Sequence, residues 1–180
     1  MNEKIFHTCC FFGHRKIDKT EELKNNLSKI IESLITDEKV DTFLFGSNSE
    51  FDDLCVKTVG KLKGKYPNIR RIYVRSAYKN ISDRYKAYLL KEYDDTYFPE
   101  KIENSGKASY AERNQKMIDQ SKFCVVYYDE NYLPPRRKNS KSDSFDYQPK
   151  SGTAIAYSYA VKKEKEIINV FEQIKKFAVL

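Results

Sequence analysis

Short apolar runs alternate along this chain with segments of helical periodicity, and this alternation restricts the fold more than any other feature. Strands separated by helices form a parallel sheet, because right-handed crossovers place the intervening helices on both faces. The sequence therefore predicts an α/β fold with a five-stranded, mainly parallel sheet in the strand order 3-2-1-4-5. The runs expected to form its strands are 5–12, 42–45, 71–74, 123–128 and 166–170.

The segments between these runs carry helix signals. The first of them places its apolar residues on one stripe, as expected for a helix that packs on a sheet. The pattern of a capping box occurs at 18–21 and again at 109–112. Residues 76–109 are less regular, with a short helix expected around 85–93, and 134–149 is expected to be a flexible basic loop.

Two glycine turns are expected to meet at one edge of this sheet. Gly13 ends the first strand, and Gly152 opens the helix that leaves the fourth strand. In a doubly wound sheet the ligand crevice lies at the carboxyl ends of the strands, where the winding direction reverses. The order 3-2-1-4-5 puts this reversal between the first and fourth strands, so both turns are predicted to line one crevice.

Ser151, Gly152 and Thr153 have two interpretations. Free backbone N–H groups and the positive end of the helix dipole bind anions at a helix start, and phosphate is the anion expected here. Ser and Thr at such a position are alternatively ordinary N-caps. The predicted convergence with Gly13 favours the anion site.

The residues after Gly13 supply polar groups to the same edge. Arg15 is suited to bidentate contact with a phosphate, and His14 to a hydrogen bond with a ribose or a leaving group. A surface ion pair for Arg15 and a hydrogen-bonded turn residue for His14 are the alternatives. Both residues are therefore candidate ligand contacts.

A small polar turn, Gly46-Ser47-Asn48, follows the second strand. Asp52 lies just beyond it, in the first turn of the expected helix. Its carboxylate is suited to bind a sugar hydroxyl, as acidic residues do in other nucleotide-binding folds. Alternatively, Asp52 only complements the helix dipole.

Glu112 and Arg113 stand together at the expected start of another helix. A Glu beside an Arg would stabilise an oxocarbenium-like centre and clamp a phosphate. The capping box also accounts for Glu112, whereas no local feature accounts for Arg113. Both are candidate catalytic residues, and Arg113 is a candidate phosphate contact as well.

Composition narrows the function classes. The net charge is +7, but apart from 70–71 and 135–138 the cations are scattered among acidic residues. A nucleic-acid footprint is a patch rather than a total, so nucleic acid is not the expected partner. The tyrosine-rich segment 85–98 is a candidate self-association interface, or else it supplies aromatics to the core.

The cysteines and histidines indicate a reducing compartment and no metal centre. The four cysteines lack C-x-x-C spacing and lie in or beside apolar runs, which is typical of buried, reduced thiols. With two histidines in the chain, no metal site or cofactor is expected. No apolar run reaches membrane-spanning length and no signal-peptide pattern is present, so we expect a cytoplasmic protein.

The ordered set of motifs resembles the SLOG superfamily, and within it the YpsA-like proteins of unknown function. This resemblance implies one Rossmann-like domain over 1–180 that binds a nucleotide or nucleotide derivative, with a role in sensing or signalling. The matching motifs are Phe12-Gly13-His14-Arg15, Gly46 through Asp52, Arg113-Asn114, and Ser151-Gly152-Thr153.

The superfamily also includes the LONELY GUY phosphoribohydrolases, which cleave the N-glycosidic bond of nucleoside monophosphates. Their catalytic Arg corresponds to Arg113, but Ala156 stands where they carry the catalytic Glu. Glycosidic cleavage needs a carboxylate, so the resemblance argues against this activity unless Glu112 or Asp52 replaces the missing group.

We therefore expect a small-molecule nucleotide ligand with its phosphate at 151–153. Asp52 and Asn48 would contact the ribose, and an aromatic residue such as Tyr128 or Phe12 would stack on the base. The enzymatic alternative is an N-glycosidic hydrolase that acts on nucleotides. The second alternative is a nucleic-acid interaction module that uses the basic loop at 134–142.

Overall fold

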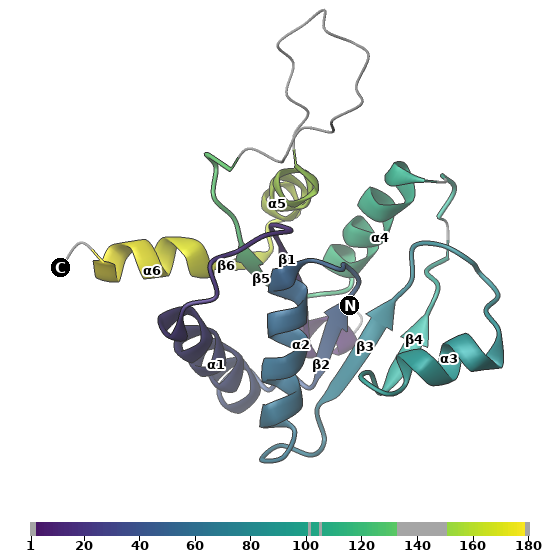
Figure 1. Cartoon of the computed structure of the whole chain (residues 1–180), viewed down its shortest axis with the longest axis horizontal. Helices are drawn as coiled ribbons and strands as arrows, with labels where there is room; N and C mark the ends of the chain where they lie inside the picture. The colour runs from purple at the N-terminus through teal and green to yellow at the C-terminus, as the bar shows by residue number, and fades with distance from the viewer. Residues whose placement is uncertain (1–2, 101, 105, 133–150, 179–180) are drawn as a thin grey trace, which may run out of the picture.

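The sheet of the computed structural model has six parallel strands in the order β4-β3-β2-β1-β5-β6 (Figure 1). The structure describes residues 3–100, 102–104, 106–132 and 151–178. The strands are β1 (Thr8–Gly13), β2 (Thr42–Phe45), β3 (Arg70–Val74), β4 (Asp95–Tyr97), β5 (Phe123–Tyr127) and β6 (Glu166–Asn169).

Helices cover both faces of this sheet. Figure 1 shows α1 and α2 on one side and α4 and α5 on the other. A short 3-10 helix, η1, precedes β1. The helices are η1 (Glu3–His7), α1 (Glu21–Thr36), α2 (Glu50–Leu62), α3 (Asp83–Leu89), α4 (Lys107–Asp119), α5 (Gly152–Lys162) and α6 (Val170–Ala178).

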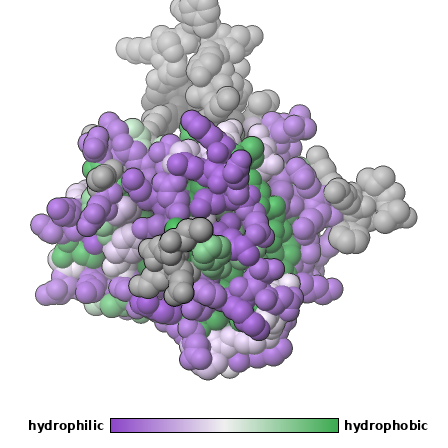
Figure 2. Space-filling model, turned by 180° about the vertical axis from the view of Figure 1, so that it is seen from behind, coloured by the Kyte–Doolittle hydropathy of each residue, from purple (hydrophilic) through white to green (hydrophobic). Residues whose placement is uncertain are grey.

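The core has two layers, separated by the sheet. On one side, Phe11 of β1 packs with residues of α1, α2 and α6, and on the other, Phe12 packs with residues of α4 and α5. Successive side chains of a strand point to opposite faces, so one apolar run supplies both layers. From behind, the molecular surface is mostly hydrophilic, with hydrophobic side chains gathered near its middle (Figure 2).

The predicted order of the five expected strands is confirmed, but the sheet has a sixth strand that we did not predict. This strand, β4, pairs with β3 at the edge of the sheet. It contains only three residues, Asp95, Thr96 and Tyr97, and lacks the apolar run that marks a buried strand. Its pairing with β3 depends on tertiary context rather than on a local pattern.

Several predicted element ends are wrong. The predicted capping box at 109–112 does not start α4, which begins at Lys107 after Gly106 in a left-handed conformation at φ +64°. The N-cap of α1 is Thr20, whose Oγ1 accepts from the backbone N–H of Leu23 at 3.1 Å. The last apolar run ends at Asn169, and the helix α6 that follows was not expected.

Other expectations about these elements fare better. A short helix, α3, forms in the irregular segment as predicted, with Leu89 buried. All four cysteines are free and buried, and the Sγ atoms of Cys10 and Cys124 lie 3.5 Å apart across the β1–β5 pair. The loop expected at 134–149 lies outside the described residues.

Gly13 ends β1 where the chain passes close to α2. A Cβ atom at this position would lie 2.5 Å from the ring of Phe51, a fully buried residue of α2. The contact involves the Cβ, Cγ and Cδ1 atoms of Phe51, which are fixed by its own burial. Only glycine therefore lets the turn after β1 lie against the start of α2.

We predict that Gly13→Ala lowers the free energy of unfolding by about 1–3 kcal/mol, because the added methyl group overpacks the contact with Phe51. Urea unfolding measures this change. The matched control is Gly64→Ala, where the nearest atom to the added Cβ is 3.4 Å away and the chain is exposed. Equal stability of both variants would contradict the proposed contact.

Candidate functional site

Hydrogen bonds tie together the turns that follow β1, β2 and β5. The backbone N–H of His14 donates to the carbonyl of Tyr127 at 3.3 Å, and that of Glu50 donates to the carbonyl of Arg15 at 3.0 Å. The turn after β1 is therefore fixed on one side to β5 and on the other to the start of α2. This is the edge at which the sequence predicts a crevice.

His14 is buried at the centre of this edge, with 1% of its surface exposed. Its Nε2 lies 2.9 Å from the backbone nitrogen of Asp129 and 3.2 Å from the carbonyl oxygen of the same residue, and burial lowers the pKa of the imidazole from its ordinary value. Nε2 accepts from that N–H in one neutral tautomer and donates to that carbonyl in the other. In either tautomer, Nδ1 has no hydrogen-bond partner among the described residues.

Aromatic rings surround His14 on the β5 side. The ring of Tyr132 stacks on the imidazole with centroids 3.9 Å apart, and Tyr128 stacks on Tyr157 of α5 at 4.4 Å. Asn169, at the end of β6, holds Tyr128 in place by bonding to both its backbone N–H and its carbonyl. This ring cluster connects the start of α5 to the end of β1.

Of the residues in this ring cluster, the sequence predicted only His14 and Tyr128 as site residues. Asn169 carries a usable signal, because an amide that directly follows a buried apolar strand stands at the ligand edge of a parallel sheet. Tyr157 lies one helical turn beyond Thr153, on the helix already singled out. No pattern in the sequence links Tyr132 to His14, because their contact joins two separate turns.

Asp52 is buried at the start of α2 and holds the turn after β2. One carboxylate oxygen, Oδ2, accepts from the backbone N–H of Ser47 at 2.9 Å and of Gly46 at 3.3 Å. The other, Oδ1, has no partner among the described residues. Burial raises the pKa of Asp52 to about 7, against the opposing effects of Arg113 and of the two N–H donors.

Arg113 reaches from α4 into the same edge and is 2% exposed. Its Nη1 donates to the carbonyl of Gly46 and, at 3.4 Å, to that of Val74. A Cβ atom at position 46 would lie 2.7 Å from three atoms of the guanidinium arm. Arg113 can therefore cover the ends of β2 and β3 only because residue 46 is a glycine. This contact explains why an arginine stands at position 113, which no feature near it in the sequence explains.

Glu112, the neighbour of Arg113, serves a different part of the chain. Its carboxylate accepts from the backbone N–H groups of Glu103 and Asn104, both at 3.1 Å, and from the side chain of Asn104. Glu112 therefore anchors the segment before α4, while Arg113 contacts the strand ends. The two candidate catalytic residues therefore bind to different segments of the chain.

The start of α5 has the geometry of a capped helix. The Oγ of Ser151 accepts from the backbone N–H of Ala154 at 3.1 Å, Thr153 is buried, and Gly152 is exposed. A Cβ atom at Gly152 would meet nothing within 4 Å. The capping interpretation is therefore correct for Ser151, and the open approach at Gly152 is compatible with an anion beside it.

The remaining candidates lie around these buried groups. Arg15 and Asn48 are exposed, and Ser47 is half-buried, with its Oγ donating to Ser49 at 3.0 Å. Within the ranges that the structure describes, no three His, Cys, Asp or Glu side chains are arranged to hold a metal ion. None of the helices described is long and apolar enough to cross a membrane.

The raised pKa of Asp52 predicts a specific pH dependence of stability. The folded protein keeps this proton up to about pH 7, whereas the unfolded chain loses it near its ordinary pKa of 3.8. Between these values the folded state binds more protons, so the free energy of unfolding falls as pH rises. Relative to Asp52→Asn, the wild type should lose on the order of 1–4 kcal/mol across this window.

Urea unfolding at several pH values measures this difference. The matched control is Asp53→Asn, which changes an exposed carboxylate on the same helix turn. Its stability should follow the wild-type pH profile. Parallel profiles for the wild type and Asp52→Asn would show that Asp52 is not the group responsible.

Comparisons with known proteins agree with this architecture. DNA processing protein A (DprA) from Streptococcus pneumoniae is 13% identical, with a TM-score of 0.57 over 90% of this chain and 49% of that one. The chain thus spans about half the length of that protein. DNA processing protein A from Helicobacter pylori, solved to describe its single-stranded DNA binding mode, is 13% identical, with a TM-score of 0.56 over 97% of this chain and 74% of that one.

At this level of identity the likeness shows the fold alone. No curated protein matches the chain. The model of the YspA SLOG family (YpsA) matches residues 7–162, which include the turns after β1 and β2, Arg113 and the start of α5. The resemblance noted in the sequence is thereby confirmed, and the chain belongs to the YspA SLOG family.

Proposed function

We propose that the turns at the carboxyl ends of β1, β2 and β5 form a crevice that binds a nucleotide or nucleotide derivative. The observation that carries this proposal is the buried His14, whose Nδ1 has no hydrogen-bond partner in the described part of the chain. A buried polar atom without a partner costs about 1–3 kcal/mol, and a hydrogen bond with a ligand would remove that cost. His14 lies where the winding of the sheet reverses, which is where ligands of this fold class bind.

The start of α5 supplies the phosphate site in this proposal. The first N–H groups of a helix have no acceptors within the helix, so those of Gly152 and Thr153 are available to an anion. Ser151 uses its hydroxyl to cap Ala154 and therefore fixes the helix start rather than competing for the ligand. Arg15 adds a cation from the turn after β1.

The sugar and the base would occupy the polar and aromatic parts of the same edge. The free Oδ1 of Asp52 and the side chains of Ser47 and Asn48 provide acceptors and donors for ribose hydroxyls. Tyr128 offers a ring that is already oriented by its stacking on Tyr157. Arg113 contributes positive charge next to the turn at Gly46, and its hydrogen bond to the carbonyl of Gly46 stabilises that turn.

Family membership is consistent with this ligand class, and a sensing or signalling role is part of the proposal. Single-stranded DNA, the ligand of the Helicobacter pylori protein, is itself a chain of nucleotides. A free nucleotide is the smaller form of the same chemistry, and it suits a crevice whose unpartnered groups are few and buried.

The helix-start site is tested with Gly152→Asp. An aspartate there should leave folding intact, because the position is open and a carboxylate at a helix start is favourable. It should nevertheless repel a phosphate and weaken nucleotide binding about tenfold or more. Calorimetry with a panel of nucleoside mono- and diphosphates measures the affinity, and native mass spectrometry of the purified protein identifies any co-purifying molecule.

Gly152→Ala is the matched control, since it adds the Cβ atom without the charge and should bind as the wild type does. Unchanged affinity in Gly152→Asp would place the phosphate elsewhere. A wild-type protein that neither binds any member of the panel nor carries a co-purified small molecule would overturn the proposal.

Asp52 supports a second candidate function, cleavage of nucleoside monophosphates at the N-glycosidic bond. A buried carboxyl with a pKa near 7 and one unpartnered oxygen is suited to proton transfer at neutral pH.

If this activity exists, chromatography of incubated nucleotides should reveal free base, and Asp52→Asn should abolish its release. Glu112→Gln should leave the release unchanged, because Glu112 is engaged with Asn104. Absence of free base across the panel would leave binding as the function.

A further inference from the structure

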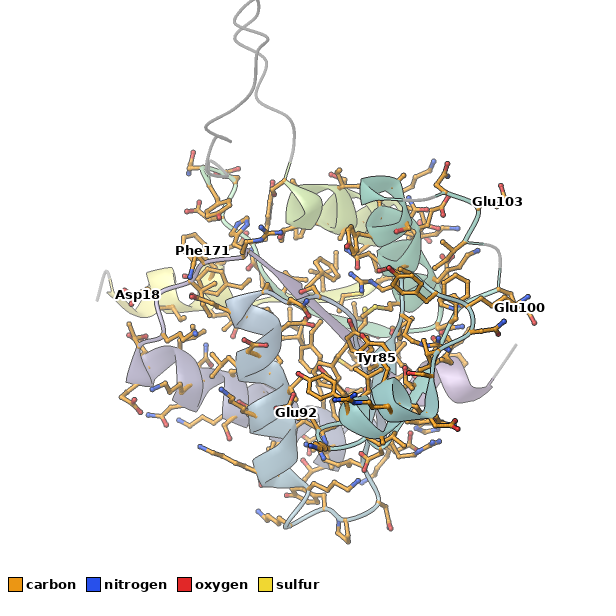
Figure 3. All side chains as sticks on the ribbon, turned by 45° about the vertical axis from the view of Figure 1, so that its right-hand side comes forward. Asp18, Tyr85, Glu92, Glu100, Glu103 and Phe171 are labelled. Atoms are coloured by element: carbon orange, nitrogen blue, oxygen red, sulfur yellow. The ribbon has the colours of Figure 1, made fainter. Side chains whose placement is uncertain are left out.

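A second cationic region lies at the edge of the molecule formed by β3, β4 and α3, on the side away from α6 (Figures 1 and 3). We call it the α3 surface and define it as the exposed and half-buried side chains of residues 75–91. This segment contains five cations and one carboxylate, Asp83. In the sequence these cations are separated by other residues, so no run of adjacent cations indicates a patch.

The fold brings three of these cations around one pocket. Arg75, Lys79 and Lys86 line a space of about 290 Å³ together with Asp83 and Thr96. Three positive charges therefore face one negative charge around an opening to solvent. Such a pocket suits an anion of the size of a phosphodiester, held by several cations at once.

Arg75 also shapes the loop that carries Lys79. Its Nη1 donates to the carbonyl of Tyr78 at 2.6 Å and to that of Lys79 at 3.2 Å, and its guanidinium lies 6.0 Å from the ring centroid of Phe98. These contacts fix the loop while its side chains stay in solvent. Arg75 follows β3, which lies two strands away from β1 and directly beside β2.

Exposed tyrosines accompany the cations. Tyr78 is 78% exposed, Tyr88 is 65% exposed and Tyr85 is 42% exposed. The rings of Tyr85 and Tyr88 are nearly parallel, at 13°, with centroids 6.3 Å apart on α3, where Figure 3 labels Tyr85. Proteins bind unpaired nucleic-acid strands with two features, a cationic groove for the phosphates and aromatic side chains on which the bases stack. Both features are present here.

We propose that the α3 surface binds single-stranded nucleic acid, with phosphodiesters at Arg75, Lys79 and Lys86 and unpaired bases stacked on Tyr85 and Tyr88. The residues that line this site differ from those of the proposed nucleotide site, and the proposal does not depend on that site. A duplex is not the fitting ligand, because its bases are not free to stack on tyrosines. A second copy of the chain is disfavoured, since the protein carries a net charge of +7 and this region is itself cationic.

Fluorescence anisotropy with labelled oligothymidylate and oligouridylate tests this proposal, and the two arms distinguish DNA from RNA. The double variant Lys79→Glu/Lys86→Glu should weaken binding about tenfold or more. It should also reduce the slope of log affinity against log salt by about 0.7 for each phosphate that the variant no longer neutralises. Lys57→Glu/Lys61→Glu on α2 is the matched control, with the same charge change at exposed positions.

Stacking is tested separately with Tyr88, which is exposed and whose replacement should not affect folding. Tyr88→Leu should weaken binding about 5- to 100-fold without changing the salt slope, whereas Tyr88→Phe should bind as the wild type does. A competing duplex of the same length should fail to displace the single strand.

Four outcomes would overturn the proposal. The first is that the wild type binds no oligonucleotide, and the second is that the α2 control loses as much affinity as Lys79→Glu/Lys86→Glu. The third is that affinity falls only when the charges of Arg136 and Arg137 are reversed. The fourth is that the protein self-associates through Tyr88 and binds no oligonucleotide. Failure here is separable from failure at the crevice. Gly152→Asp should leave oligonucleotide binding intact, and Lys79→Glu/Lys86→Glu should leave mononucleotide binding intact.

Discussion

The pairing of β1 with β5 is the interaction on which the rest of the structure depends. The two strands run in register from Cys9 opposite Phe123 to Gly13 opposite Tyr127, and side chains on both of their faces are buried. Parallel strands need cover on both faces, so this pair fixes which helices form each layer. The winding direction also reverses between these two strands, and their carboxyl ends therefore define the edge at which His14 and Asp129 meet.

That edge is unusual in how much polarity it buries. His14, Asp52 and Arg113 are each at most 2% exposed, although apolar residues would fill the same volume without a desolvation cost. Arg113 bonds to backbone carbonyls, so it stabilises the ends of β2 and β3. His14 and Asp52 each keep one unpartnered polar atom within the described structure. Unpartnered buried atoms of this kind call for an explanation, and a ligand at this edge is the explanation that we propose.

The proposed nucleotide site and the proposed α3 site differ in the interactions that they offer a ligand. At the proposed nucleotide site the polar groups are few, buried and fixed by the backbone, which favours selective recognition of a small molecule and weak dependence on salt. On the α3 surface, cations and tyrosine rings stand in solvent, which favours a flexible polyanion and strong dependence on salt. Arg75 follows β3, and β2 lies between β3 and the central β1–β5 pair. The two regions therefore lie at different parts of the same sheet edge.

The sequence alone was enough to predict the α/β class, the order of five strands and the turns after Gly13 and Gly46 at the carboxyl edge of the sheet, because buried strands and glycine turns leave local patterns. The tertiary structure alone decided what lies against these turns. The guanidinium of Arg113 meets Gly46 and Tyr132 stacks on His14 only after distant segments pack, and no local pattern records such contacts. The same reason explains β4, a three-residue strand that exists through its pairing with β3, and the α3 surface, whose cations are spaced along the chain but surround one pocket in space.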